Sequence, residues 1–231
     1  MTKLIKKSEA QGQWYPVSVN RLDALLFKSI HSGRGYRHTY ALRRNIAYNL
    51  QYIEYLDRSV LDLKLSSVLI TQTWKTFVIV GCGIIESLLH YLLIANGSYA
   101  KTEWEFIAVA PGNSKKLDGE VRKIDSHIYR KLKSPKLKQM TFDAMIQKSE
   151  SHRVLGANQD LYDKLKRLRP LRNKVHLQAI GNDTDTDWNS FNWTDACYMA
   201  QVIHDVFTSN IFHPSADERA YFDYLQRYVE T

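Results

Sequence analysis

Apolar residues recur every three or four positions over much of the chain, a spacing that places side chains on one face of an α-helix. The clearest stripe lies between residues 40 and 65 and consists of Leu42, Ile46, Leu50, Ile53, Leu56, Val60 and Leu63. A second run, 67–96, is apolar nearly all round and stops before Gly97, a residue that favours a helix end. Glu86 and His90 interrupt this run, so we expect a buried core helix and not a membrane span.

Two glycines, Gly81 and Gly83, lie inside the predicted helix at 67–96. Each weakens a helix by roughly 1 kcal/mol relative to alanine. A glycine inside a helix therefore needs a reason, and close approach of another helix would supply one. We expect such an approach at both positions.

The rest of the pattern predicts a helical protein. Further helices are expected at 22–30, 118–132, 141–156, 159–178, 195–212 and from Ser215 onward. Thr141 is the expected N-cap of one of them, and either Thr194 or Asn192 caps another. We therefore predict an all-α bundle of about six to seven helices. It forms a single domain at 39–231, preceded by an irregular N-terminal arm with a short helix at 1–38.

The densest group of candidate functional side chains lies within 161–180, LYDKLKRLRPLRNKVHLQAI. Arg169, Arg172 and His176 stand at i, i+3 and i+7, so they fall on one face of a continuous helix. The apolar stripe of the same helix consists of Leu161, Leu165, Leu168, Leu171 and Val175. Pro170 leaves two alternatives, because proline removes a backbone donor and disfavours helical geometry at the residue before it. Either the helix is kinked just before Arg172, or a new helix begins at Pro170.

Charge is the one bulk property that changes this picture. The net charge is +8 and the isoelectric point is about 9.3, which permits nucleic-acid binding. The stretch 115–138 holds nine basic residues against three acidic ones, and Arg130 and Lys131 lie within it. Two interpretations stay open for this stretch: a solvated helix face, or a surface that follows nucleic-acid phosphates.

Several other kinds of site find no support in the residues. The alternating Asp183, Asp185 and Asp187 lack the glycine and glutamate of an EF-hand calcium loop, so a polar surface turn is expected. Histidine and cysteine show no zinc spacing, and neither a nucleophile elbow nor a dinucleotide loop is present, so no metal and no cofactor are expected. Cys82 and Cys197 have apolar neighbours and should be buried free thiols. The first residues lack an apolar stretch, which favours a cytoplasmic protein without membrane attachment.

The segment LRNKVH resembles the signature of HEPN domains, which are helical domains of bacterial defence proteins, toxin–antitoxin pairs and RNA-processing factors. That signature is an arginine, often followed by asparagine, and then a histidine after four to six residues. Arg172 has the asparagine neighbour, Asn173, but only three residues separate it from His176, whereas Arg169 leaves six. Both arginines therefore stay candidates. The segment VGCGIIESLLHYLLIANG, residues 80–97, also resembles the long first helix of many HEPN proteins, with an acid in an apolar stretch.

The chemistry of these residues suits RNA cleavage without a metal. A histidine with a pKa of about 6.5 exchanges protons near neutral pH, and an arginine matches phosphate oxygens. His176 is the expected acid or base, and Arg172 or Arg169 is the expected phosphate clamp. Asn173 would orient the phosphate or the histidine. The further candidates are Lys174, Arg130 and Lys131 for substrate binding, and Glu86 and His90 as supporting residues.

The resemblance implies a homodimer, because HEPN ribonucleases pair two protomers so that both motifs line one cleft. A second His176 would then supply the second proton-transfer group. The resemblance also implies RNA as a partner, and a neutralising antitoxin or other partner protein if the chain acts as a toxin or defence effector. Two alternatives stand beside this hypothesis. One is a non-catalytic HEPN-like module that dimerises and binds RNA or a protein; the other is a structural role, with the arginine paired to an acid such as Glu86.

Overall fold

A computed structural model of the chain describes residues 14, 16–178 and 180–228. The chain divides into two compact units. The first, the helical body, comprises residues 1–98 and 141–231. The second, the hairpin arm, comprises residues 99–140 and interrupts the body in sequence.

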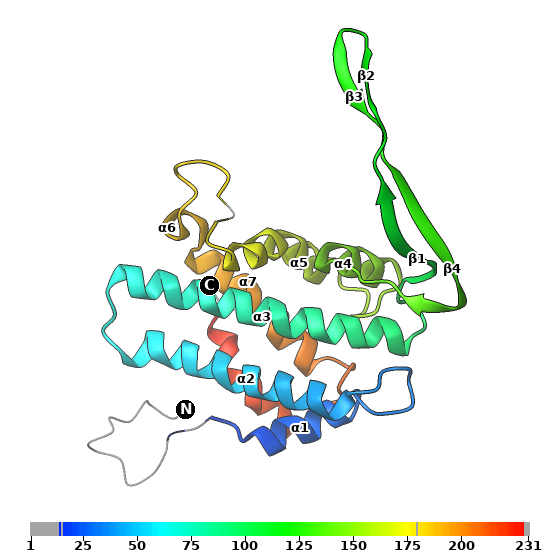
Figure 1. Ribbon diagram of the computed structural model, residues 1–231. Coiled ribbons are helices and arrows are strands. Elements are labelled where there is room, and N and C mark those ends of the chain that lie inside the picture. Colours follow the sequence, from blue (N-terminus) through cyan, green and yellow to red (C-terminus); the bar gives the residue numbers. More distant parts are fainter. Residues whose placement is uncertain (1–13, 15, 179, 229–231) are drawn as a thin grey trace. The chain divides into compact units, whose positions relative to one another are not determined.

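The helical body is formed by α-helices and two 3₁₀ segments (Figure 1). Its described elements are α1 (Val19–Phe27), α2 (Thr39–Asp62), α3 (Ser67–Ala95), α4 (Phe142–Ser151), α5 (Gln159–Arg172), η1 (Asn173–Val175), α6 (Asp187–Ser190), α7 (Trp193–Thr208), α8 (Ala216–Arg219) and η2 (Ala220–Tyr228). The helices expected at 22–30, 40–65, 67–96, 141–156 and 195–212 are confirmed, with ends that differ by a few residues. The amphipathic pattern was therefore sufficient to find the main helices of this unit.

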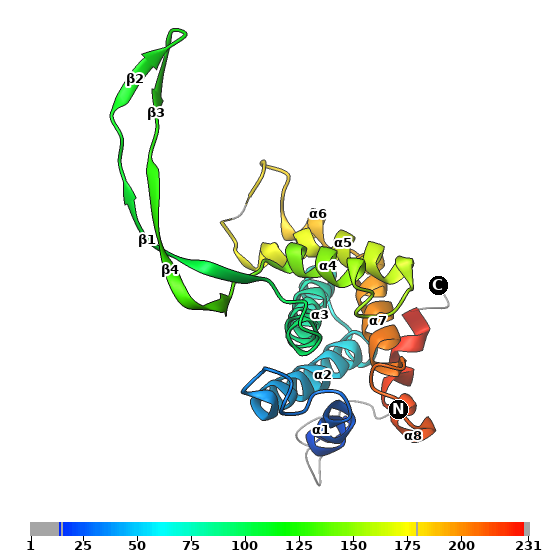
Figure 2. The ribbon, with the colours of Figure 1, turned by 90° about the vertical axis from the view of Figure 1, so that its right-hand side faces the viewer.

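Helix α3 is the centre of the body, because α2, α4, α5 and α7 all pack against it. In Figure 2, α3 lies between α2 on one side and α4 and α5 on the other. Its fully buried side chains include Val78, Cys82, Ile85, Leu88, Leu89 and Leu93. By length and composition α3 could cross a membrane, but 61% of its most apolar window is buried inside the protein. The expectation of a core helix is confirmed.

The two glycines of α3 have different surroundings. A Cβ atom on Gly81 would come within 2.5 Å of Met199 Cγ on α7, so the expected close helix approach is confirmed there. Gly83 is exposed, and a Cβ atom at this position would meet no described atom within 4 Å. The same expectation is therefore wrong for Gly83.

Polar side chains mark the points where the helices begin. Thr141 Oγ1 accepts a hydrogen bond from the Ala144 N–H at 3.2 Å, as expected for an N-cap. Asn192 Oδ1 accepts one from the Asp195 N–H at 3.1 Å, which decides between the two alternatives for α7. At the C-terminal end of α3, Gly97 has a φ of +70°, a left-handed conformation that glycine adopts without strain.

The stretch expected to be an irregular arm contains a packed helix. Helix α1 contacts α2 and buries Leu22, Leu25 and Leu26. The ring of Trp14 lies 6.3 Å from that of Tyr55, centroid to centroid, so Trp14 docks on α2. The remainder of the expected arm, residues 1–13 and 15, lies outside the described residues.

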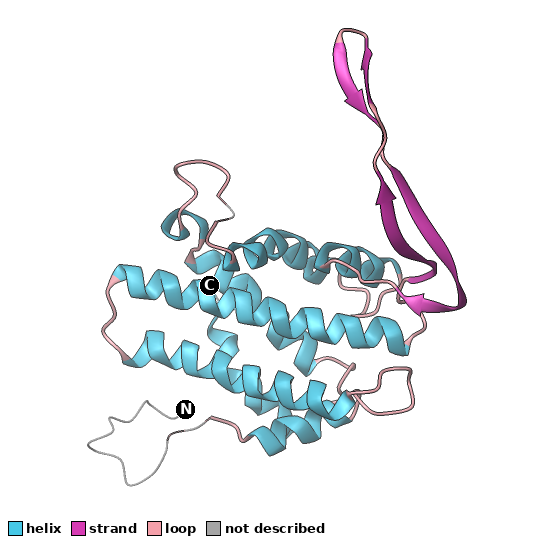
Figure 3. Ribbon diagram, viewed as in Figure 1, coloured by secondary structure: helices cyan, strands magenta, loops and turns pink. Residues whose placement is uncertain are grey.

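The hairpin arm consists of β-strands, which Figure 3 shows in magenta. Two antiparallel ladders form it: β1 (Lys101–Ala110) with β4 (Ser126–Leu137), and β2 (Ser114–Leu117) with β3 (Glu120–Lys123). The basic helix expected at 118–132 is therefore wrong, and the fold is mostly helical rather than all-α. The cause lies at the turn between β2 and β3, where Asp118 and Gly119 have φ values of 53° and 83°. Asp-Gly pairs adopt this two-residue hairpin turn readily, and it fixes the pairing of the strands on either side.

A second glycine fixes the passage from one ladder to the other. A Cβ atom on Gly112 would lie 2.0 Å from the Ile124 carbonyl oxygen, so only glycine fits. The Gly112 N–H also donates to Asp125 Oδ1 at 3.0 Å. At the base of the arm, the Lys138 N–H donates to the Ala100 carbonyl oxygen at 2.8 Å. Backbone hydrogen bonds thus hold the two ladders and the base of the arm, and the Asp125 side chain bridges the passage between the ladders.

Candidate functional site

The motif helix α5 is continuous through Pro170 and ends at Arg172. A 3₁₀ turn, η1, follows, and His176 has extended backbone geometry with φ −88° and ψ 102°. The helix expected to continue to residue 178 therefore ends early, and the alternative of a new helix at Pro170 is wrong. His176 lies beyond the helix end, so it does not share a helical face with Arg169 and Arg172. Pro170 has no N–H to donate to the carbonyl group four residues earlier, so α5 lacks one backbone hydrogen bond just before its C-terminal end.

The guanidinium group of Arg172 is held by Glu86 of α3. Its Nε and Nη2 atoms donate to the same carboxylate oxygen, Glu86 Oε2, at 3.1 and 2.9 Å. The Arg172 side chain is 36% exposed and that of Glu86 is 23% exposed. The expected pairing of Glu86 with an arginine of this helix is confirmed, and it is also the pair that the structural alternative predicts. Within the described part of the chain, the Nη1 edge of Arg172 has no hydrogen-bond partner, and such an edge can bind a phosphate oxygen.

The other candidate arginine has a different neighbour. Arg169 Nη1 lies 2.8 Å from Asp143 Oδ1 on α4, and both side chains are well exposed. Arg169 thus ties α5 to α4, whereas Arg172 ties α5 to the core helix. Asn173 is exposed and forms the C-cap of α5.

The histidine of the motif is exposed and has apolar neighbours in sequence. His176 lies in an exposed segment, and three residues around it present apolar side chains to solvent: Val175, Leu177 and Ile180. Leu177 is the most exposed of the three, at 73%. Among the described residues, no hydrogen bond is made by the His176 side chain.

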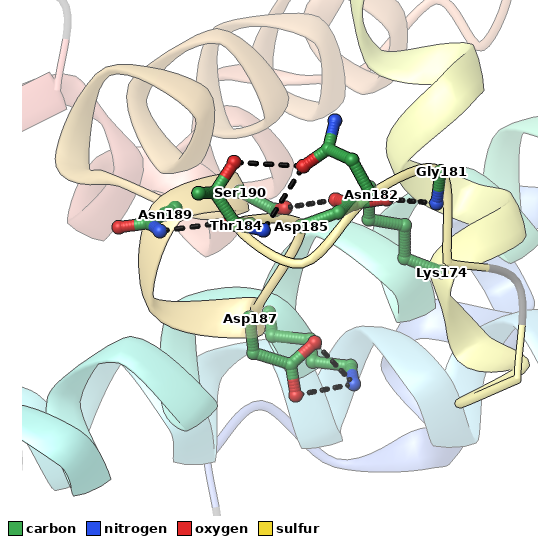
Figure 4. A network of polar contacts seen from close by, with 9 residues as sticks. Lys174, Gly181, Asn182, Thr184, Asp185, Asp187, Asn189 and Ser190 are labelled. Atoms are coloured by element: carbon green, nitrogen blue, oxygen red, sulfur yellow. Dashed lines mark hydrogen bonds and ion pairs between the residues drawn. The ribbon is translucent and has the colours of Figure 1, made fainter.

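The loop after the motif is tied back to the body by acidic side chains (Figure 4). Asp185 accepts from Lys174, from the Gly181 N–H at 3.0 Å and from Ser190 Oγ at 3.0 Å. These partners, Lys174 first, lower the pKa of Asp185 to about 2. Lys174, a candidate for substrate binding, is therefore already paired.

A second acid of this loop contacts the core helix. Asp187 accepts from Lys75 Nζ at 2.9 and 2.8 Å and from Gln72 Nε2 at 3.0 Å. The alternating aspartates, expected to form only a polar turn, also anchor this loop to α3. Their spacing does not indicate this contact, because Lys75 and Asp187 are 112 positions apart in the sequence. The anchors fix both ends of the segment that follows His176.

Cys82 and His90 lie on α3 about one turn to either side of Glu86. Cys82 is buried next to the Leu168 carbonyl, and burial followed by Glu86 raises the pKa of its thiol to about 12, so it stays protonated. Cys197 is also a buried free thiol, as expected for both cysteines. The pKa of His90 is lowered by burial, and its ring packs edge-on against Tyr36 at 5.7 Å. His90 therefore faces the loop at Tyr36 and serves packing there.

The remaining candidates belong to the arm, not to the body that carries the motif. Arg130 forms an ion pair with Glu105, and Lys131 lies opposite Trp104 in the β1–β4 register. Among the described residues, no group of three or more His, Cys, Asp or Glu side chains is arranged to hold a metal ion. No protein-family model, no curated protein and no solved structure matches this chain.

Proposed function

We propose that this protein is a HEPN-like, metal-independent endoribonuclease that acts as a homodimer in the cytoplasm. One observation carries the proposal: at one end of α5, Glu86 holds Arg172 with a free guanidinium edge while His176 is exposed just beyond the helix. A pre-oriented cation can stabilise charge on a phosphate and an accessible imidazole can transfer a proton, and both support phosphodiester cleavage. An effector of bacterial defence, restrained by a partner protein, is the role that this chemistry fits best.

The proposed reaction needs two proton transfers. One histidine removes the proton of the RNA 2′-hydroxyl, whose oxygen attacks the adjacent phosphorus. The bond from phosphorus to the 5′-oxygen breaks, and a protonated histidine donates its proton to that oxygen. The products are a 2′,3′-cyclic phosphate and a 5′-hydroxyl. The Arg172 guanidinium would stabilise the negative charge that grows on the phosphate oxygens.

The second histidine would come from a second copy of the chain. The exposed apolar side chains of Val175, Leu177 and Ile180 flank His176 and support a contact there, since apolar groups beside a motif mark interaction surfaces. Two copies joined at this segment would bring two imidazoles to one cleft. Light scattering of wild type against Leu177→Asp tests this step, and we expect the variant to be monomeric and inactive.

An RNA cleavage assay in EDTA tests the proposed chemistry. Wild type, His176→Ala and Arg172→Ala are compared with two matched controls, His152→Ala and Arg167→Ala, which remove an exposed histidine of the body and an exposed arginine of the same helix. We expect His176→Ala to lose about 10²- to 10⁴-fold in rate, with both controls close to wild type. Cleavage by His176→Ala at the wild-type rate would overturn the assignment.

The same assay identifies the phosphate clamp. If Arg172 serves, then Arg172→Ala loses activity, Arg169→Ala keeps it, and Glu86→Gln falls between them because the guanidinium is less firmly held. The reverse order of the two arginine variants would assign the clamp to Arg169. If folded, dimeric wild type cleaves no RNA, the enzyme proposal fails, and the non-catalytic module that binds RNA or a protein takes its place.

A further inference from the structure

Aromatic rings gather on one face of the β1–β4 ladder in the hairpin arm. Trp104 lies opposite Lys131 in the register. Phe106 lies opposite Tyr129. Because alternate residues of a strand point to the same side, His127, Tyr129 and Lys131 share one face of β4. The ring centroids agree, since Phe106 lies 5.9 Å from Tyr129 and 5.7 Å from His127. We call Trp104, Phe106, His127 and Tyr129 the ring face.

The ring face is open to solvent. Trp104, Phe106 and Tyr129 are 52%, 51% and 51% exposed, and Trp104 and Tyr129 line an open hollow. None of residues 101–140, all of which the structure describes, is buried. The arm therefore has no core of its own into which these rings could turn. Large rings left exposed on one side of a ribbon indicate a surface that binds something.

The charge of the arm indicates what it binds. Residues 99–140 carry ten basic and five acidic residues, a net charge of +5 out of +8 for the whole chain. Glu105 is shared by Arg130 and Lys136, and Asp125 is paired with Lys123. Basic residues without an acidic partner among the described residues include Lys115, Lys116, Lys131 and Lys133. The arm would repel a second copy of itself, which carries the same positive charge, whereas it would attract a polyanion.

We propose that the ring face binds single-stranded nucleic acid, with bases stacked on its rings and phosphates on the neighbouring lysines. Rings that stack with any base, beside lysines that follow the backbone, are the features of single-strand binding without sequence preference. A duplex hides its base faces and could use only the charges. This inference goes beyond the proposed cleavage, because it uses neither Arg172 nor His176.

Fluorescence anisotropy tests the proposal in the full-length His176→Ala protein, so that RNA is not consumed. The probes are labelled oligouridine and oligothymidine of about 15 nucleotides and a duplex of the same length. Trp104→Ala and Tyr129→Ala are compared with Ile128→Ala, which removes an apolar side chain of similar exposure from the opposite face of β4. We expect each ring variant to weaken single-strand binding by roughly 5- to 100-fold and the control to bind like wild type.

The salt dependence separates stacking from charge. Trp104→Ala should lower the affinity at every salt concentration and leave the slope of log affinity against log salt unchanged. Lys131→Ala should reduce that slope by about 0.7, the value for one phosphate contact on a single strand. Equal binding to oligouridine and oligothymidine is expected from stacking alone; a preference for RNA would add a contact to the 2′-hydroxyl.

Three results would overturn the proposal. The first is no binding of either single strand by the parent protein, and the second is tighter binding of the duplex than of the single strands. The third is a Trp104→Ala protein that binds like its parent but changes its mass in light scattering, which would make the ring face a contact between chains. Circular dichroism and melting of each variant show whether the helical body is intact.

Discussion

The helical body buries many of its large apolar side chains, whereas the hairpin arm leaves most of its own exposed to solvent. Ile85 of α3 is fully buried, whereas Ile128 of β4 is 49% exposed. The body gains stability from burying such side chains, at about 25 cal/mol for each Å² removed from water. The arm gains its shape from backbone ladders and a glycine turn, and a lone two-stranded ribbon is only marginally stable. The difference teaches that an apolar side chain stabilises the fold only where the protein removes it from water, and the exposed apolar groups of the arm therefore contribute little to folding.

The largest expected effect is on the core of the body. Ile85→Ala should lower the free energy of unfolding by about 2–5 kcal/mol, because it leaves a cavity in the central helix. Ile128→Ala, the same change in the arm, should alter it by less than about 0.5 kcal/mol. Urea unfolding followed by far-UV circular dichroism measures both. A large effect of Ile128→Ala would break the comparison, since it would mean that the arm contributes to the stability of the body.

A smaller effect on stability is expected from the carboxyl group of Glu54, which the helical body partly buries. Burial raises the pKa of Glu54 to about 7, and Arg58 opposes the rise only in part. The folded state thus binds a proton that the unfolded state has lost, so this group destabilises the fold as pH rises from about 4.5 through 7. Glu54→Gln should therefore stabilise the protein by about 1–3 kcal/mol above pH 7 and by little at about pH 4.5.

Thermal melting at several pH values measures this. A stabilisation by Glu54→Gln that is the same at every pH would show that hydrogen bonding or packing, and not the carboxyl charge, causes it.

Within α3 itself, one glycine is packed and the other is open. Gly81→Ala should lower the free energy of unfolding by about 1–2 kcal/mol, because Met199 must move. Gly83→Ala should raise it by up to about 1 kcal/mol, because alanine favours the helix and nothing stands in its way. Denaturant titrations of the two single variants give the difference directly. The same sign for both would contradict the distinction between a packed and an open face of this helix.

The smallest effects are expected for exposed ion pairs, which both units contain. Arg169→Ala removes the pair with Asp143 in the body, and Arg130→Ala removes the pair with Glu105 in the arm. Each should cost less than about 1 kcal/mol, because water and salt screen exposed charges. If the melting temperature falls clearly more for one variant than for the other, that ion pair also stabilises the structure around it.

The main helices of the body could be predicted because each buries an apolar stripe against neighbouring helices, with α3 at the centre. Periodicity and N-caps such as Thr141 and Asn192 carry that information locally. The arm could not be predicted in this way, since a strand with both faces exposed has no alternation between a buried and a solvated side. Its basic residues were therefore assigned to a helix. The local signal for a hairpin is Asp118–Gly119, a pair typical of two-residue hairpin turns.

The sequence indicated which residues belong to the candidate site, but not how they are arranged in space. The pairing of Arg172 with Glu86 followed from an acid placed in an apolar helix, where a charge needs a partner. The end of α5 at Arg172 could not be predicted, because no residue near it is a strong helix-stop signal. Pro170 indicated that the helix would end earlier. The attachment of Asp185 to Lys174 depends on how the loop folds back, which a spacing rule does not contain.

The bond between the Lys138 N–H and the Ala100 carbonyl brings the two ends of the arm together. A chain that departs and returns at neighbouring points forms a detachable cassette, and such insertions can be gained, lost or exchanged without redesign of the host fold. A lineage could thus alter its choice of ligand through the cassette while the surrounding helices keep their sequence. Replacing the strands with a short glycine linker would reproduce that evolutionary step in a single cloning experiment.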